Sequence, residues 1–273
     1  MKRTMALCGF CLCVLTSTTP AIAGKFTDGK KFPSLLASDV PAAVNGWVDS
    51  MYSSMHLDSL GLKRDIFFMA LKGYEYLLSQ NKLQRPEVLT ICDYSQVSSA
   101  KRLYVIDMVG GTLLYNTFVS HGARSGTDMA TSFSNKNNSH KSSLGFMITG
   151  ETYRGKAGYS MHFDGQEKGI NSNVRMRNIV LHGSWYVNED RADAGAMMGR
   201  SYGCPAVPYG EHEDIIDHIT GGSCFFAYSP DYMYLKSSKI LNAHFNWPVA
   251  IMAANTFGQT EVMAPAQASA SLR

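Results

Sequence analysis

The stretch Gly199–Pro208, "GRSYGCPAVP", decides between two folds because it fits two catalytic motifs at once. Its first five residues match the G-x-S-x-G nucleophile elbow of α/β-hydrolases, with Ser201 at the centre. The same stretch also presents Cys204 directly after a glycine, with His182 upstream. The two interpretations demand different surroundings, so the flanking sequence can separate them.

The flanks of Ser201 do not fit the elbow, which needs a buried strand before the serine and a helix directly after it. The preceding "EDRADAGAMMGR" is not an apolar run. A helix that began at Tyr202 would contain Pro208 in its interior, at a cost of ~3 kcal/mol or more. Only three histidines follow Ser201, and two of them belong to a polar helical segment. The serine-hydrolase interpretation is therefore disfavoured.

Cys204 fits its surroundings better. A thiol nucleophile must be partly thiolate near neutral pH, and a nearby histidine supplies this as an ion pair or as a base. His182 ends the apolar run "RNIVLHG", so we expect it where a buried strand emerges at the sheet rim. Gly183 and Gly203 permit close backbone approach, and the amides of Gly203 and Cys204 are candidate oxyanion donors. A lone histidine after an apolar run is as often structural, so spacing alone leaves both interpretations open.

The order "IVLHGSW" then "GRSYGCPAVP" resembles the catalytic domain of L,D-transpeptidases, the YkuD-like family of peptidoglycan cross-linking enzymes, and within it the murein L,D-transpeptidase branch. The resemblance runs from about Val88 to Tyr228 and includes "NTFVSHG" and "KSSLGFMITGETYRG". It departs from the best-known pattern at two positions. Tyr202 replaces the usual histidine, and Pro205 stands where an arginine often follows the cysteine. Arg200 could instead bind a substrate carboxylate bidentately, or be an ordinary solvated loop residue.

The resemblance implies a mechanism with peptidoglycan stem peptides as partners. Cys204 attacks the L-centre carbonyl of the third stem residue and expels the terminal D-amino acid, while His182 acts as general base and then acid. An amine from a second stem gives a 3-3 cross-link, whereas water makes the enzyme an L,D-carboxypeptidase. Ser201 and the backbone around Gly183 orient the imidazole, unless Ser201 only caps a turn. A non-catalytic cell-wall-binding protein is the alternative from another class.

Residues 1–23 predict a cleaved signal peptide: Lys2 and Arg3, an apolar run and a small-x-small pattern at its end. The apolar run is shorter than the ~20 residues that span a bilayer, which disfavours a membrane anchor. We therefore expect a periplasmic or otherwise extracytoplasmic protein that keeps no stable membrane span after cleavage. The oligomeric state stays open.

The mature chain excludes several other classes. Without residues 1–23, the chain keeps 23 of its 25 basic residues and all 22 acidic ones, a net charge of +1. It contains no basic block that would indicate nucleic-acid binding. No H-E-x-x-H or C-x-x-C pattern remains, so we expect neither metal nor cofactor. Three cysteines remain. We expect Cys92 and Cys224 to be buried small hydrophobes in preference to a mutual disulfide, which leaves Cys204 in different surroundings.

Hydrophobic periodicity predicts an α+β fold. Residues 38–55 and 62–83 have helical spacing, so residues 24–85 should form an N-terminal helical segment packed on the catalytic domain, residues 86–256. The latter holds many short β-type runs, which favour a mainly antiparallel sheet or sandwich of the L,D-transpeptidase type. One late helix is expected within residues 209–222. The small, polar residues 257–273 predict a disordered tail.

Overall fold

The computed structural model describes residues 40–244 and 246–248. The predicted signal peptide (residues 1–23) and the predicted tail (residues 257–273) lie outside the described residues, as does the start of the predicted helical segment. No helix within the described ranges has the length and apolar character needed to cross a membrane.

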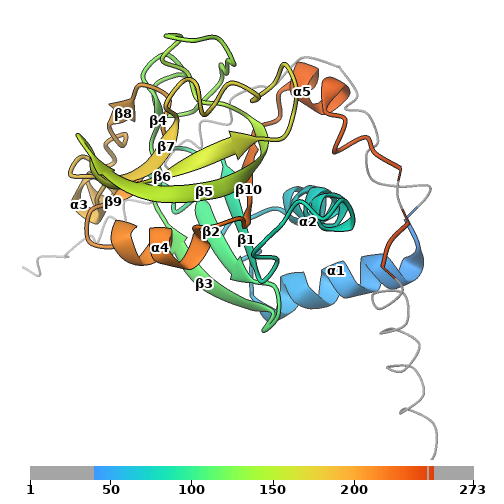
Figure 1. The fold of residues 1–273 in the computed structure, drawn as a ribbon. Coiled ribbons are helices and arrows are strands. Elements are labelled where there is room, and N and C mark those ends of the chain that lie inside the picture. Colours follow the sequence, from blue (N-terminus) through green and yellow to red (C-terminus); the bar gives the residue numbers. More distant parts are fainter. Residues whose placement is uncertain (1–39, 245, 249–273) are drawn as a thin grey trace, which may run out of the picture. The chain divides into compact units, whose positions relative to one another are not determined.

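An eight-stranded mixed sheet is the main element of the described chain, in the order β3-β2-β1-β10-β5-β6-β7-β9 (Figure 1). Its strands are β1 (Val88–Asp93), β2 (Leu103–Asp107), β3 (Thr112–Thr117), β5 (Gly145–Gly155), β6 (Gly158–Gly165), β7 (Val180–Ser184), β9 (Ala206–Pro208) and β10 (Cys224–Tyr228). The β1–β10 and β7–β9 pairs are parallel, and the other five pairs are antiparallel. The predicted mainly antiparallel α+β fold is confirmed.

Two adjacent inner strands, β1 and β10, are buried along their whole length. Their sequences, "VLTICD" and "CFFAY", are mainly apolar and do not alternate with polar residues, as expected when protein covers both faces of a strand. Cys92 and Cys224 lie on these strands, and both are buried and free. Burial raises the pKa of the Cys92 thiol to about 12, so this cysteine is an inert part of the core.

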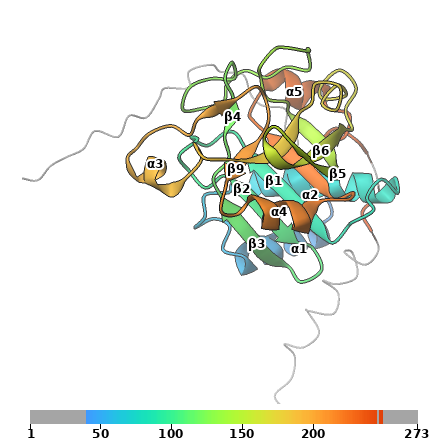
Figure 2. The ribbon, with the colours of Figure 1, turned by 60° about the vertical axis from the view of Figure 1, so that its left-hand side comes forward.

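The described residues form five helices. They are α1 (Ala42–Ser54), α2 (Arg64–Ser79), α3 (Glu189–Asp193), α4 (His212–Ile219) and α5 (Tyr232–Ser237). Helix α2 packs on β1 and β10, whereas α4 packs on β6, β7 and β1. Figures 1 and 2 show α2 and α4 on opposite sides of β1. Helix α4 is the predicted late helix, with three isoleucines buried on one face. Apolar residues of α1 and α2 join the same buried cluster as the sheet, although the boundary at residue 85 stays a prediction.

A short second sheet lies beside the site. It consists of β4 (His121–Gly122) and β8 (Arg200–Ser201), paired in parallel. Together, β8 and β9 flank the segment that contains Cys204 on its two sides. The pairing of β8 with β4 and of β9 with β7 therefore anchors both ends of this segment.

Gly73 on α2 tests the packing of helix on sheet. A Cβ at this position would lie 1.9–2.5 Å from ring atoms of Phe146 on β5. Helix propensity alone favours alanine over glycine by about 1 kcal/mol. We expect the opposite sign for Gly73→Ala, a loss of ~1–3 kcal/mol in the free energy of unfolding, because the ring is fixed in the core. Urea unfolding measures this loss. The control is Gly210→Ala, where a Cβ meets no atom within 4 Å; equal stabilities for the two variants would contradict the packing described.

Candidate active site

A cavity of about 850 Å³ opens beside β7. It brings together five residues predicted from the sequence: Cys204, His182, Ser201, Arg200 and Tyr202. Gly183 and Gly203 do not line the cavity but adjoin residues that do. The backbone fixes the pair, since the N–H of His182 donates to the carbonyl of Pro205, the residue after Cys204, at 3.4 Å.

The turn before Cys204 requires glycine at position 203. Gly203 has φ +122°, and a Cβ there would lie 2.7 Å from the Lys141 carbonyl oxygen. The Ser201 hydroxyl closes this turn: it accepts the Gly203 N–H at 3.0 Å and donates to the Cys204 carbonyl at 2.6 Å. These bonds match the turn-capping alternative for Ser201. They also occupy the Gly203 amide, which leaves the amide of Cys204 as the candidate oxyanion donor.

The Cys204 thiol is half-buried, and it is held by two backbone groups. The Val180 N–H points at Sγ at 3.5 Å, and the thiol donates to the Asn178 carbonyl at 3.6 Å. Burial raises the pKa of the thiol, although the Val180 N–H and the Arg177 guanidinium counteract this in part. The resting side chain is therefore a protonated thiol.

The His182 imidazole is oriented by its own neighbour. Its Nδ1 lies 2.9 Å from the Gly183 carbonyl oxygen. Because a carbonyl only accepts, Nδ1 carries the proton and Nε2 presents a lone pair. Burial lowers the pKa of His182, and the nearby His212 lowers it further, whereas the bond to Gly183 opposes both. The imidazole is thus neutral, and the pair consists of a neutral thiol and a neutral base.

Gly183 is needed for a packing reason. A Cβ at this position would lie 2.6 Å from the ring of His212. That ring is buried, with its Nδ1 2.8 Å from the Tyr209 carbonyl oxygen. The close approach of α4 to β7 therefore leaves no space for a side chain beside His182. The sequence placed His212 in a polar helix with exposed histidines, which is wrong for this residue because its ring faces the sheet.

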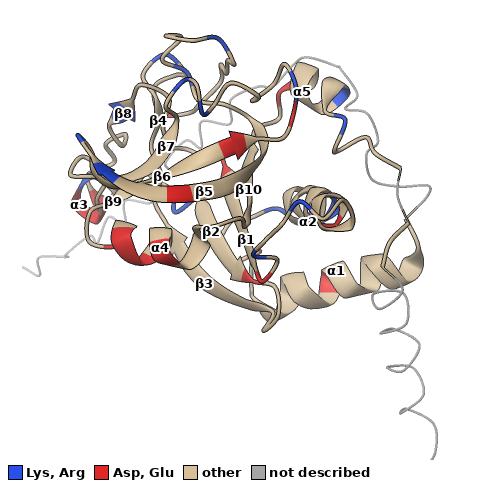
Figure 3. Ribbon diagram, viewed as in Figure 1, with Lys and Arg blue, Asp and Glu red and all other residues tan. Residues whose placement is uncertain are grey.

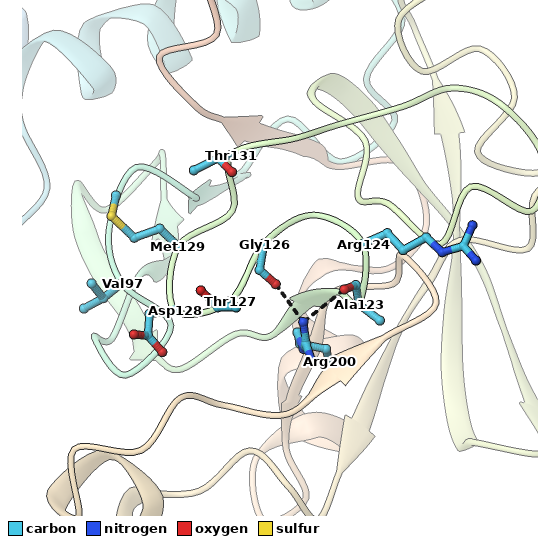
Figure 4. Close-up of a pocket in the computed structure, with 9 residues that line it drawn as sticks. All are labelled: Val97, Ala123, Arg124, Gly126, Thr127, Asp128, Met129, Thr131 and Arg200. Carbon is cyan, nitrogen blue, oxygen red and sulfur yellow. Dashed lines mark hydrogen bonds between the residues drawn. The ribbon is translucent and has the colours of Figure 1, made fainter. Parts of the chain in front are cut away.

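Arg200 and Tyr202 are placed at the edge of the cavity. Nη1 of Arg200 donates to the carbonyls of Ala123 and Gly126, at 3.1 and 3.0 Å, and so holds the loop that lines a second, open cavity of about 660 Å³ (Figure 4). Tyr202 is 75% exposed, and its ring stacks on that of His140 with centroids 4.3 Å apart. Tyr202 thus adds an exposed aromatic ring to the lining of the cavity.

Two further features of the cavity were not found from the sequence. The Arg177 guanidinium donates to the carbonyls of Ser134 and Lys141 and to two serine hydroxyls, which fixes the loop beside Cys204. Tyr153 on β5 stacks on His162 on β6, with centroids 4.5 Å apart. A lone arginine and a tyrosine–histidine pair without a motif gave no signal in a single sequence.

A half-buried thiol and a neutral imidazole in one cavity, on a mixed sheet, define a candidate site for cysteine-dependent acyl transfer. Within the described residues, no group of three or more histidines, cysteines and carboxylates could hold a metal ion. Residues 59–228 match the sequence profile described as the L,D-transpeptidase catalytic domain. The chain therefore belongs to this family, which supports a function related to peptidoglycan.

Solved structures show only distant likeness. An L,D-transpeptidase from Mycobacterium smegmatis is 11% identical, with a TM-score of 0.33, over 52% of this chain and 59% of that one. An L,D-transpeptidase from Stackebrandtia nassauensis is 14% identical, with a TM-score of 0.32, over 67% and 76%. The helical cell shape determining protein Pgp2 from Campylobacter jejuni, as a mutant, is 13% identical, with a TM-score of 0.34, over 80% and 64%. The family assignment therefore rests on the sequence profile. No curated protein matches the chain.

The raised pKa of the thiol predicts the pH dependence of its alkylation. The thiolate forms only as the pH passes the raised pKa, so the alkylation rate of Cys204 by chloroacetamide should have its midpoint above the ordinary value of about 8.5. Mass spectrometry of the native protein measures this rate. Cys204→Ala should show no fast phase, because Cys92 and Cys224 are buried. A midpoint below 8 would mean that Cys204 and His182 rest as an ion pair.

Proposed function

We propose that this protein is an exported, cysteine-dependent peptidoglycan L,D-transpeptidase that forms 3-3 cross-links. The observation that carries the proposal is the arrangement of two side chains: Cys204 and His182 line one cavity, and the Gly183 carbonyl holds the His182 proton on Nδ1. Export rests on the character of residues 1–23, which also assigns the site to an extracytoplasmic compartment.

In the proposed reaction, Nε2 of His182 accepts the thiol proton as Sγ of Cys204 attacks the L-centre carbonyl of the third stem residue. A neutral starting pair suits this step, because the imidazole is already a free base. The tetrahedral oxyanion accepts a hydrogen bond from the Cys204 N–H. When the intermediate collapses, the bond to the terminal D-amino acid breaks, and His182 returns the proton to the leaving amine. The acyl group then remains on Sγ as a thioester.

The acceptor in the second half of the reaction distinguishes a transpeptidase from a carboxypeptidase. An amine of another stem attacks the thioester, loses a proton to His182 and leaves a 3-3 cross-link, with the thiol restored. Water in place of the amine would make the protein an L,D-carboxypeptidase.

Product analysis tests the proposal. The mature protein is incubated with a disaccharide tetrapeptide, and products are separated and identified by mass. We expect a dimer in which one terminal D-amino acid has been lost, and no dimer with Cys204→Ala. Tripeptide without dimer would establish hydrolysis instead. No product from the wild-type protein with a tetrapeptide donor would favour the non-catalytic wall-binding alternative.

The role of His182 predicts a large and specific loss. His182→Gln removes the base but keeps a polar side chain, so we expect the rate of product formation to fall by about 10²–10⁴-fold. The matched control is His218→Gln on α4, since His218 is exposed and does not line the cavity. The rate with His218→Gln should stay within two-fold of the wild-type rate. A His182→Gln variant with more than a tenth of wild-type activity would remove His182 from the mechanism.

A further inference from the structure

The charges that line the cavity around Cys204 are of one sign. Three cations line it, Lys156, Arg177 and Arg200, and so do three histidines. No aspartate or glutamate among the described residues lines the cavity. The mature chain has almost equal numbers of acidic and basic residues, so this asymmetry is a property of the cavity and not of the whole protein.

The carboxylates on the neighbouring strands are already engaged. Glu151 on β5 and Asp164 on β6 both bind Arg175, at 2.7 and 3.0 Å and at 2.5 and 2.9 Å. The hydrogen bonds from Arg175 hold the pKa of Glu151 down at about 2. These two carboxylates therefore form ion pairs with Arg175 and do not neutralise the cations of the cavity.

Of the three cations, none forms an ion pair with a described carboxylate, and Lys156 is the one whose N–H donors are not engaged by the described part of the protein. Arg177 donates to four oxygens of its own loop, and Arg200 donates to two carbonyls. Lys156 is exposed and has no hydrogen bond or ion pair with any described residue. It lies in the turn between β5 and β6, whose tip is blue in Figure 3, and it lines the same cavity as the stacked rings of Tyr153 and His162.

We propose that this cavity selects an anionic acyl donor, a stem peptide with a free carboxylate on the part that becomes the acyl group, and that Lys156 is the specificity-determining contact. A contact with a part of the substrate that does not react can position the scissile carbonyl against Sγ. A donor whose third residue carries the side-chain amine without a side-chain carboxylate has a net positive side chain, and the same lining would disfavour it. The inference rests on the proposed function for the identity of the ligand.

Equilibrium binding tests this inference without catalysis. Three tetrapeptide donors are titrated calorimetrically into Cys204→Ala: the parent, the amide of the carboxylate on the second residue, and the amide of the side-chain carboxylate on the third. We expect one amide to bind about five-fold more weakly than the parent at low salt. That ratio should fall towards one at 0.5 M salt, because the charges are exposed.

A second set of proteins assigns the contact. In Cys204→Ala with Lys156→Gln, the weaker amide and the parent should bind equally. The control Lys168→Gln removes an exposed lysine that lines a different cavity, and it should keep the five-fold ratio. Equal binding of all three donors to Cys204→Ala, or a ratio that survives Lys156→Gln, would overturn the inference. If the ratio is found but the wild-type protein forms no product from the parent donor, the proposed function fails and the selectivity stands.

Discussion

Parallel pairing of β7 with β9 is the constraint on which the site depends. The register places His182 opposite Ala206, two residues after Cys204. Strand β9 has only three residues, so the turn before it must place Cys204 level with His182 along the paired strands. Gly203 makes this possible with a positive φ that residues with side chains rarely adopt, and Ser201 closes the turn with two hydrogen bonds. One short strand and one turn therefore bring the thiol and the imidazole to the same cavity.

The basic lining of the cavity and the raised pKa of the thiol are compatible. The Arg177 guanidinium favours the thiolate, but burial opposes ionisation more strongly, and Lys156 lies in an exposed turn. Burial therefore has the largest effect on the pKa of the thiol. The positive charge is available to a substrate, while the nucleophile remains protonated until the base acts. A protonated thiol is also less prone to oxidation than a thiolate in an oxidising compartment.

Sequence reasoning found the fold class and the buried cysteines from local patterns. It paired Cys204 with His182 through the resemblance to L,D-transpeptidases, because spacing alone left that pairing open. Apolar runs indicated β1 and β10, and the prolines around Cys204 disfavoured a nucleophile elbow. The single sequence could not find Arg177, His140 or the stacked pair on β5 and β6, because their roles depend on contacts between distant segments. It also treated Gly203 as an oxyanion donor, whereas the Gly203 amide is bound to Ser201, a contact that only the geometry of the turn reveals.

The central claim is that Sγ of Cys204, and not the hydroxyl of Ser201, carries the acyl group. Peptide mapping of protein quenched in acid during reaction with a tetrapeptide donor tests it most directly. The account predicts a mass increase equal to the donor without its terminal residue, localised by fragmentation to Cys204 and removed by hydroxylamine at neutral pH, as for a thioester. An adduct on Ser201 that resists hydroxylamine would contradict the account.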